Sequence, residues 1–170
     1  SEECQVSRLV DIDEDVFDTL IRLKKLVGGG YKPILQKAIR QEPSGTELSP
    51  SNLSIVIANE MPENSIISDE GITCAADLFE QTKAAPKHDW LSITGGSIGQ
   101  GLPVSFGASI ACPSRKVIAF QADGSAMYTV QTLWSIAREN ADVTIVILNN
   151  KSYAILNIEL ERLKVGAPNS

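Results

Sequence analysis

The chain has 170 residues, 43% of them hydrophobic, and carries 15 basic against 21 acidic side chains, a net charge of −6 at pH 7. An acidic chain without a basic cluster excludes a non-specific nucleic-acid-binding protein, whose affinity comes from neutralised phosphates, so we expect no nucleic-acid partner. No apolar stretch approaches the roughly 18–20 residues that a membrane helix needs, and the first residues lack the pattern of a signal peptide, so we expect no membrane partner.

The three cysteines, Cys4, Cys74 and Cys112, are an odd number and lie far apart in the chain. This spacing suits neither a disulfide framework nor a CxxC metal site. We therefore expect reduced thiols that serve as small packing residues, and a cytoplasmic location.

The first segment, residues 1–30, is predicted to contain one helix. Asp13 is the expected N-cap, and apolar residues recur after it at the spacing of one helix face. These residues are Val16, Leu20, Leu23 and Val27. Three consecutive glycines then end the helix. We expect residues 1–30 to be the end of a preceding domain or a flexible N-terminal helix, and the polar, proline-containing residues 31–48 to be a linker.

From residue 49 to residue 170, helix and strand signals alternate. Ser49 is an N-cap residue with proline at the first helical position, which predicts a helix to about Glu60. Strands are predicted at 65–69, 90–93, 116–122 and 143–148. Further helices are predicted at about 74–83, after the glycine cluster through Ile110, behind a Thr129 cap, and from about Tyr153.

Two of these strands, 116–122 and 143–148, are nearly continuous apolar runs. Strands that are buried on both faces have this composition, and strand–helix alternation is typical of parallel sheets. The sequence therefore predicts an α/β fold: a three-layer parallel sheet with helices on both faces.

Polar clusters follow the predicted strands, where an open parallel sheet binds its ligands. Asp123 and Asn150 come after neighbouring strands, and both side chains supply oxygen. Together with the Ser152 carbonyl they predict three Mg²⁺ ligands, with diphosphate oxygens and water completing the shell. The N–H groups of Gly124 and Ser125 can meet a phosphate. The alternative interpretation is that each cluster is only a turn or a loop.

The glycine cluster at residues 95–101 also has two interpretations. It is either a tight turn between strand and helix or a dinucleotide-binding loop. The nearest acidic residue at a strand end is Asp123, which Gly and Ser follow, an awkward setting for a ribose contact. The chain has no GxxxxGK[ST] motif, so a nucleotide triphosphatase is not expected.

Asp-Gly-Ser at 123–125, with Asn-Asn ending 27 residues after the aspartate, resembles the metal motif of thiamin diphosphate-dependent enzymes, with Ala122 where the commonest form has glycine. The stretch TGGSIGQGLPVSFGASIACPSRKVIAFQADGSAMYTVQTLW is similar to the acetolactate synthase large-subunit and benzoylformate decarboxylase branch. The resemblance covers about residues 48–164. It implies the C-terminal, diphosphate-binding domain of a three-domain fold, with the final elements of that domain expected beyond Ser170.

The resemblance implies a role for each site residue. Asp123, Asn150 and the Ser152 carbonyl would hold Mg²⁺. Ile98 would be the apolar wedge that bends the cofactor, and Gly96 would offer its carbonyl to the aminopyrimidine. The remaining residues expected to contact thiamin diphosphate are Ser97, Gly124, Ser125 and Tyr153.

In the family, a glutamate from the partner subunit activates the pyrimidine, and Glu70 does not match its motif. The resemblance therefore implies that the full-length protein is a homodimer or homotetramer that acts on a small 2-oxo acid as a decarboxylase or carboligase, and that this chain by itself is inactive. Two alternatives stay open: a non-catalytic homologue or subunit-interaction module, and a Rossmann-like nucleotide-binding domain.

Overall fold

The structure is a computed structural model that describes residues 7–28, 30, 32 and 40–164. The chain divides into two compact units, residues 1–35 and 36–170, and each is considered by itself. Most of the predicted linker before residue 40, and Cys4, lie outside the described residues. Within the described part, no helix is long and apolar enough to cross a membrane.

The first unit contains one described helix, α1 (Val16–Val27). Its N-cap is Asp15, whose carboxylate accepts a hydrogen bond from the Asp18 N–H at 3.0 Å. The prediction of Asp13 as the cap was therefore wrong by two residues. The reason is a turn just before the helix, in which the Asp11 N–H donates to the Glu14 carboxylate at 2.9 Å and the chain is not yet helical.

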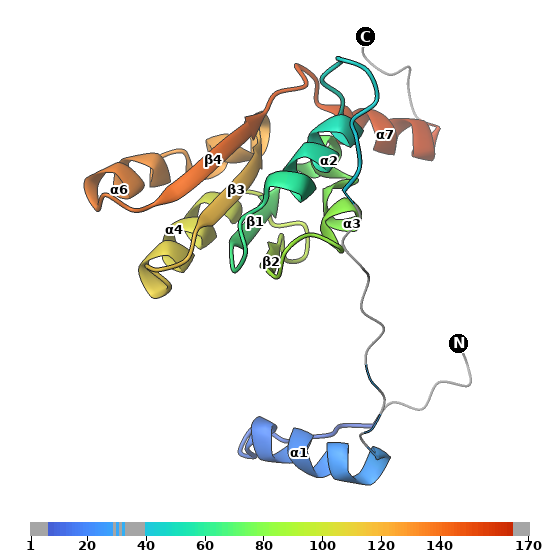
Figure 1. Cartoon of the computed structure of the whole chain (residues 1–170), viewed down its shortest axis with the longest axis vertical. Coiled ribbons are helices and arrows are strands. Elements are labelled where there is room, and N and C mark those ends of the chain that lie inside the picture. Colours follow the sequence, from blue (N-terminus) through green and yellow to red (C-terminus); the bar gives the residue numbers. More distant parts are fainter. Residues whose placement is uncertain (1–6, 29, 31, 33–39, 165–170) are drawn as a thin grey trace. The chain divides into compact units, whose positions relative to one another are not determined.

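The second unit alternates strands and helices, as Figure 1 shows. Its strands are β1 (Ile66–Glu70), β2 (Asp89–Ser92), β3 (Val117–Ala122) and β4 (Val143–Leu148). Its α-helices are α2 (Pro50–Glu60), α3 (Leu78–Thr82), α4 (Gly101–Ala111), α5 (Asp123–Ala126), α6 (Thr132–Arg138) and α7 (Ala154–Leu163). Two short 3₁₀ helices are η1 (Ile72–Ala75) and η2 (Met127–Thr129).

The four strands form one parallel sheet in the order β2-β1-β3-β4. Ile66 pairs with both Asp89 and Val117, and Val117 pairs in turn with Val143. All four strands therefore start at one edge of the sheet and end at the opposite edge. The predicted parallel α/β class is confirmed.

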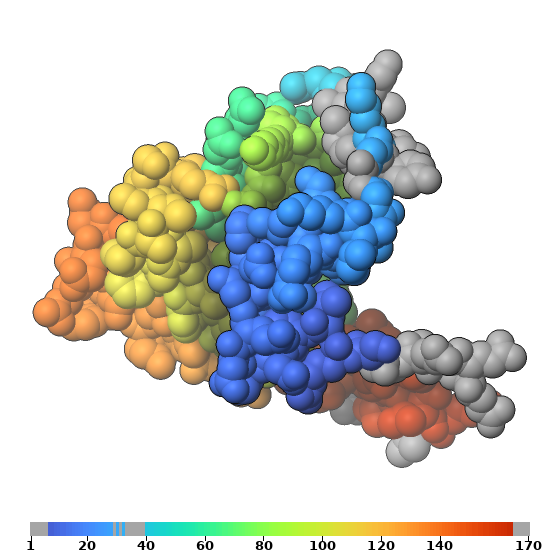
Figure 2. Space-filling model, turned by 90° about the horizontal axis from the view of Figure 1, so that it is seen from below, coloured from blue at the N-terminus to red at the C-terminus, as the bar shows by residue number. Residues whose placement is uncertain are grey.

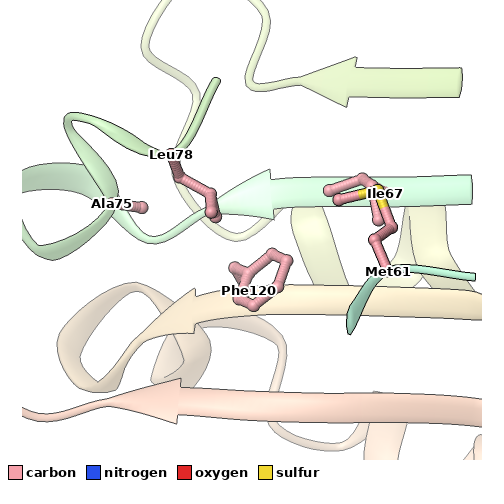
Figure 3. Close-up of a cluster of buried hydrophobic side chains, with 5 residues drawn as sticks. All are labelled: Met61, Ile67, Ala75, Leu78 and Phe120. Carbon is pink, nitrogen blue, oxygen red and sulfur yellow. The ribbon is translucent and has the colours of Figure 1, made fainter. Parts of the chain in front are cut away.

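One face of the sheet packs against α2, η1 and α3 through an apolar cluster. Figure 3 shows its five buried side chains: Met61, Ile67, Ala75, Leu78 and Phe120. Ile67 and Phe120 belong to the two central strands, and the other three come from the helical layer. Burial of these side chains is the main apolar contribution to this half of the unit.

The opposite face packs against α4 and is built from smaller and more polar residues. Ser68, Glu70 and Gln121 lie on it, and each is almost completely buried. From α4, Gly101 and Ser105 are buried on the same side. Small side chains let a helix approach a sheet closely, so α4 lies tight against the ends of β1 and β3. Helix α6 packs beside α4, and Figure 2 shows the two segments next to each other in yellow and orange.

Two predicted helices differ from those observed. The helix expected at 74–83 is instead two pieces, η1 and α3, which are separated by a turn at Ala76 and Asp77. The helix expected behind a Thr129 cap is η2 followed by α6. Thr129 does not cap it, because its hydroxyl donates to the Gly99 carbonyl at 2.8 Å instead.

Segment 40–48 is fastened to α2 by Asn52. The Asn52 amide accepts from the Ser44 N–H at 2.9 Å and donates to the carbonyls of Ser44 and Glu47 at 2.8 and 2.9 Å. Ser49 caps α2 as predicted, with its hydroxyl accepting from the Asn52 N–H at 3.2 Å. Neither Cys74 nor Cys112 forms a disulfide with a described residue.

Candidate functional site

A pocket of about 380 Å³ lies at the carboxyl ends of the strands. Its walls come from the segments that follow each of the four strands. β1 is followed by η1, β2 by Ile93 and the glycine loop at residues 95–101, β3 by α5, and β4 by the start of α7. The parallel register therefore brings four distant parts of the chain to one cavity, as expected for ligand sites of open α/β sheets.

Eight of the nine predicted site residues line this pocket. They are Gly96, Ile98, Asp123, Gly124, Ser125, Asn150, Ser152 and Tyr153. The ninth, Ser97, is exposed and does not line it. Its N–H donates to the Thr94 carbonyl at 3.1 Å, so Ser97 lies at the outer bend of the loop. The roles expected for these residues stay predictions.

The three predicted metal ligands differ in their present contacts. Within the described residues, the Asp123 carboxylate takes part in no hydrogen bond or ion pair, and no group of three or more His, Cys, Asp or Glu side chains is arranged to hold a metal. The Asn150 side chain is engaged at both ends. Its oxygen accepts from the Ser152 N–H at 3.0 Å, and its nitrogen donates to the Thr73 hydroxyl at 3.4 Å. An amide oxygen has two lone pairs, so that of Asn150 keeps one acceptor position.

The glycine loop takes a path that depends on glycine at three positions. Gly95, Gly96 and Gly99 have φ angles of 60°, 72° and 95°, in the left-handed region that side chains with a Cβ disfavour. At Gly99 space is also short, because a Cβ would lie 2.7 Å from that of Tyr128. Ile98, between Gly96 and Gly99 in the chain, lines the pocket.

The loop is held by a residue that sequence reasoning did not assign, Glu70. Only 1% of Glu70 is exposed. One of its carboxylate oxygens accepts the N–H of Gly99, and the other accepts the N–H of Gly101. Glu70 ends β1, one residue beyond the end of the strand predicted at 65–69. Gly99 and Gly101 lie 29 and 31 residues farther along the chain, so these contacts are visible only in the three-dimensional structure.

The sequence also missed most of the apolar wall. The pocket is also lined by Ile72, Thr73 and Cys74 of η1, by Ile93, and by Ile155 and Leu156 of α7. Those in η1 were assigned to a turn or a helix, with no signal that they face a cavity. The apolar spacing of α7 is visible in the sequence, but it does not tell which helix face meets the pocket.

Beside the pocket, burial raises the pKa of Asp69. A hydrogen bond from the Gly71 N–H, 3.0 Å from the carboxylate, lowers that pKa, and the negative charge of Glu70 raises it. Desolvation is the largest of the three effects. The two adjacent carboxylates of β1 lie on opposite faces of the sheet, as alternate strand residues do.

Comparison with known proteins decides the family. Residues 71–169 match the family described as thiamine pyrophosphate enzyme, C-terminal TPP binding domain. The chain belongs to the thiamine pyrophosphate enzymes. The resemblance drawn from the sequence is thus confirmed, and the pocket lies within the part of the chain that matches the family's cofactor-binding domain.

Individual members of the family share this region. IlvX of Mycobacterium tuberculosis, whose provisional name is acetolactate synthase large subunit, is 46% identical over 139 residues, which are 82% of this chain and 27% of IlvX. Benzoylformate decarboxylase of Pseudomonas aeruginosa is 30% identical over 146 residues, 84% of this chain and 28% of the enzyme. The chain therefore spans less than a third of the length of these curated relatives.

Among solved structures, the thiamine diphosphate-dependent 4-hydroxybenzoylformate decarboxylase of Rhodococcus jostii RHA1 superposes with a TM-score of 0.69 at 26% identity. The match covers 90% of this chain and 31% of the decarboxylase. The predicted fold, that of a thiamin diphosphate-binding domain, is confirmed by this likeness.

We expect Gly101→Ala to destabilise the protein. A Cβ at residue 101 would lie 2.0 Å from Gln121 Nε2 and 2.7 Å from Glu70 Oε2, so buried groups must shift at a cost of about 1–3 kcal/mol. Gly107→Ala is the control on the same helix, where a Cβ meets nothing within 4 Å. It should be neutral or stabilising by up to about 1 kcal/mol because alanine favours helix. Urea unfolding of both variants measures the difference, and equal stability would contradict the tight packing.

We expect Asp69→Asn to stabilise the protein at neutral pH. The folded state raises the pKa of Asp69, so it binds the proton more readily than the unfolded chain, and stability is lost as pH rises through the raised pKa. Asparagine removes this penalty and can still accept the Gly71 N–H. The advantage of the variant should shrink as pH falls through the raised pKa and should be gone below the ordinary aspartate pKa of about 4. Unfolding curves from pH 3 to pH 8 test this, with the exposed Asp77→Asn as the control for lost negative charge.

Proposed function

We propose that this chain is the cofactor-binding module of a thiamin diphosphate- and Mg²⁺-dependent 2-oxo acid decarboxylase or carboligase. The observation that carries the proposal is the pocket at the strand ends. Asp123 and Asn150 line it together with Gly96 and Ile98. Two motifs that the sequence keeps far apart, the metal motif and the glycine loop, thus meet at one cavity.

The chemistry of the lining residues fits a metal-bridged diphosphate. A carboxylate, an amide oxygen and a main-chain carbonyl are hard oxygen donors, which Mg²⁺ prefers. None of the described residues that line the pocket is cationic. A bound diphosphate would therefore need the metal to balance its charge, with Asp123, Asn150 and the Ser152 carbonyl as the ligands. The N–H groups of Gly124 and Ser125 are the donors proposed for the phosphate oxygens.

When bound, thiamin diphosphate supplies the nucleophilic carbon and the electron sink that loss of carbon dioxide from a 2-oxo acid requires. The residues of this chain would bind and orient. Ile98 would act by shape, pressing on the cofactor from the glycine loop. The Gly96 carbonyl would accept a hydrogen bond from the amino group of the aminopyrimidine, and Tyr153 would close the pocket near the diphosphate. By holding a bound cofactor in one conformation, these residues would lower the entropic cost of its reaction.

The carboxylate that activates the pyrimidine is proposed to come from a partner subunit. Among the described lining residues the only carboxylate is Asp123, which is assigned to the metal. Glu70 is buried and already occupied by two backbone N–H groups. Assembly as a homodimer or homotetramer, in a cytoplasmic location, belongs to the same proposal. Exposed apolar side chains on η2, α6 and α7 support such assembly, among them Tyr128, Trp134 and Ile158.

The names of the relatives support the substrate class. Benzoylformate and 4-hydroxybenzoylformate, in the names of two of them, are 2-oxo acids, and acetolactate synthase names a carbon–carbon bond-forming reaction. The alternative is a non-catalytic homologue that binds cofactor or subunits without turnover. Release of carbon dioxide from pyruvate or benzoylformate by the full-length protein, loaded with cofactor and Mg²⁺, distinguishes the two.

Asp123→Ala should abolish the Mg²⁺-dependent part of thiamin diphosphate binding. Without the carboxylate the metal no longer bridges protein and diphosphate, and we expect affinity to fall at least tenfold, about 1.4 kcal/mol or more. Asp142→Ala is the matched control, since Asp142 pairs with Lys116 at the opposite edge of the sheet. Titration calorimetry with and without Mg²⁺ measures both variants. Wild-type affinity in Asp123→Ala would refute the metal assignment.

Ile98→Ala should slow the exchange of the cofactor's C2 proton at least tenfold while changing cofactor affinity less. The smaller side chain no longer holds the cofactor bent, whereas the diphosphate anchor is untouched. Ile98→Leu conserves the apolar volume and should keep most of the exchange rate. Proton–deuterium exchange followed by NMR, with the melting temperature measured in parallel, tests this. Normal exchange in an Ile98→Ala protein with a lowered melting temperature would identify Ile98 as a packing residue only.

A further inference from the structure

The backbone of the glycine loop is held on both sides of Gln100 by side chains from other segments of the unit. Gly99 and Gly101 donate their N–H groups to the two carboxylate oxygens of Glu70. The Ser68 hydroxyl donates to the Gly101 carbonyl at 2.9 Å. The Thr129 hydroxyl donates to the Gly99 carbonyl at 2.8 Å. Both polar groups of each glycine thus have a partner outside the loop.

The side chain of Gln100, fixed between these two glycines, ties down the start of the loop. Its oxygen accepts from the Thr94 N–H at 3.2 Å, and its nitrogen donates to the Ser92 carbonyl at 3.3 Å. The loop is therefore closed by contacts at its base and at its far end. Ile98 lies between the two sets of contacts, so its position over the pocket depends on them.

Glu70 is central to this arrangement because its two oxygens meet two converging donors. A carboxylate only accepts hydrogen bonds, whereas a glutamine of the same shape would turn an NH₂ group toward one of the N–H groups. Within the described residues Glu70 forms no ion pair, so its charge is balanced by backbone N–H groups at the start of α4. The buried Gln121 amide lies beside it, since Glu70 and Gln121 pair across the sheet.

We propose that Glu70 is a positioning residue for cofactor binding: its carboxylate sets the place of the glycine loop, and hence of Ile98 and the Gly96 carbonyl. The inference rests on the proposed function, because it assigns the loop to the cofactor. Glu70 does not line the pocket and acts only through Gly99 and Gly101. The loop then keeps its shape before any ligand arrives, which lowers the ordering cost of binding.

The test is Glu70→Gln in the protein, with two measurements. Amide hydrogen exchange without cofactor should become at least tenfold faster at residues 95–101 and stay unchanged in the sheet. Affinity for thiamin diphosphate with Mg²⁺ should fall at least tenfold. Ser105→Ala is the matched control, because the Ser105 hydroxyl is equally buried on α4 but bonds only to the Leu102 carbonyl of its own helix. It should change neither quantity, even if it lowers the melting temperature.

Each remaining outcome is decisive. Wild-type affinity in Glu70→Gln, or unchanged exchange in the loop, would overturn the proposal. Failure of the wild type itself to bind the cofactor would overturn the proposed function and this role with it, while the exchange data would still report whether Glu70 holds the loop. If Glu70→Gln does not fold, Glu70→Asp replaces it. Aspartate keeps both acceptors but is one methylene shorter, and the same two changes are expected.

Discussion

Parallel pairing of β1 with β3 is the constraint on which the rest of the second unit depends. It fixes Glu70 opposite Gln121, 51 residues farther along the chain, and so brings the ends of the two strands to one line. Every functional segment starts within a few residues of that line. Because the side chains of a strand alternate between faces, the same pairing directs Phe120 into the apolar core and Gln121 toward α4. A register shift of one residue would exchange these two environments.

The two faces of the sheet serve different purposes. On the α2 and α3 side, large apolar residues fill the space, as in an ordinary core. On the α4 side, buried polar groups replace them, and neither end of the Gln121 amide has a hydrogen-bond partner among the described residues. Burying polar groups costs free energy that apolar residues would not cost. The buried polar groups lie next to the pocket, where they hold the glycine loop in a defined geometry at some expense of stability.

The sequence predicted β3 and β4 nearly to the residue, since their continuous apolar runs are signals that few other structures produce. It also predicted which strand ends carry Asp123 and Asn150, because both residues directly follow those runs. It could not predict the role of Glu70, which depends on contacts with Gly99 and Gly101 far along the chain. The prediction that Thr129 caps a helix was wrong for a related reason. A threonine that caps a helix cannot be distinguished in a sequence from one whose hydroxyl donates to a distant carbonyl, here that of Gly99.

Because the Glu70 carboxylate is buried, the geometry of the glycine loop should also depend little on the salt concentration of the solvent. The ion pairs found among the described residues, such as Lys116–Asp142 and Arg40–Glu60, are largely exposed. At an ionic strength of 0.1 M, mobile ions screen such charges beyond about 10 Å, and higher concentrations weaken them further. Mobile ions cannot reach the buried Glu70 carboxylate, whose partners are backbone N–H groups. We therefore expect the glycine loop to keep its geometry at salt concentrations that screen most of the ion pairs at the protein surface.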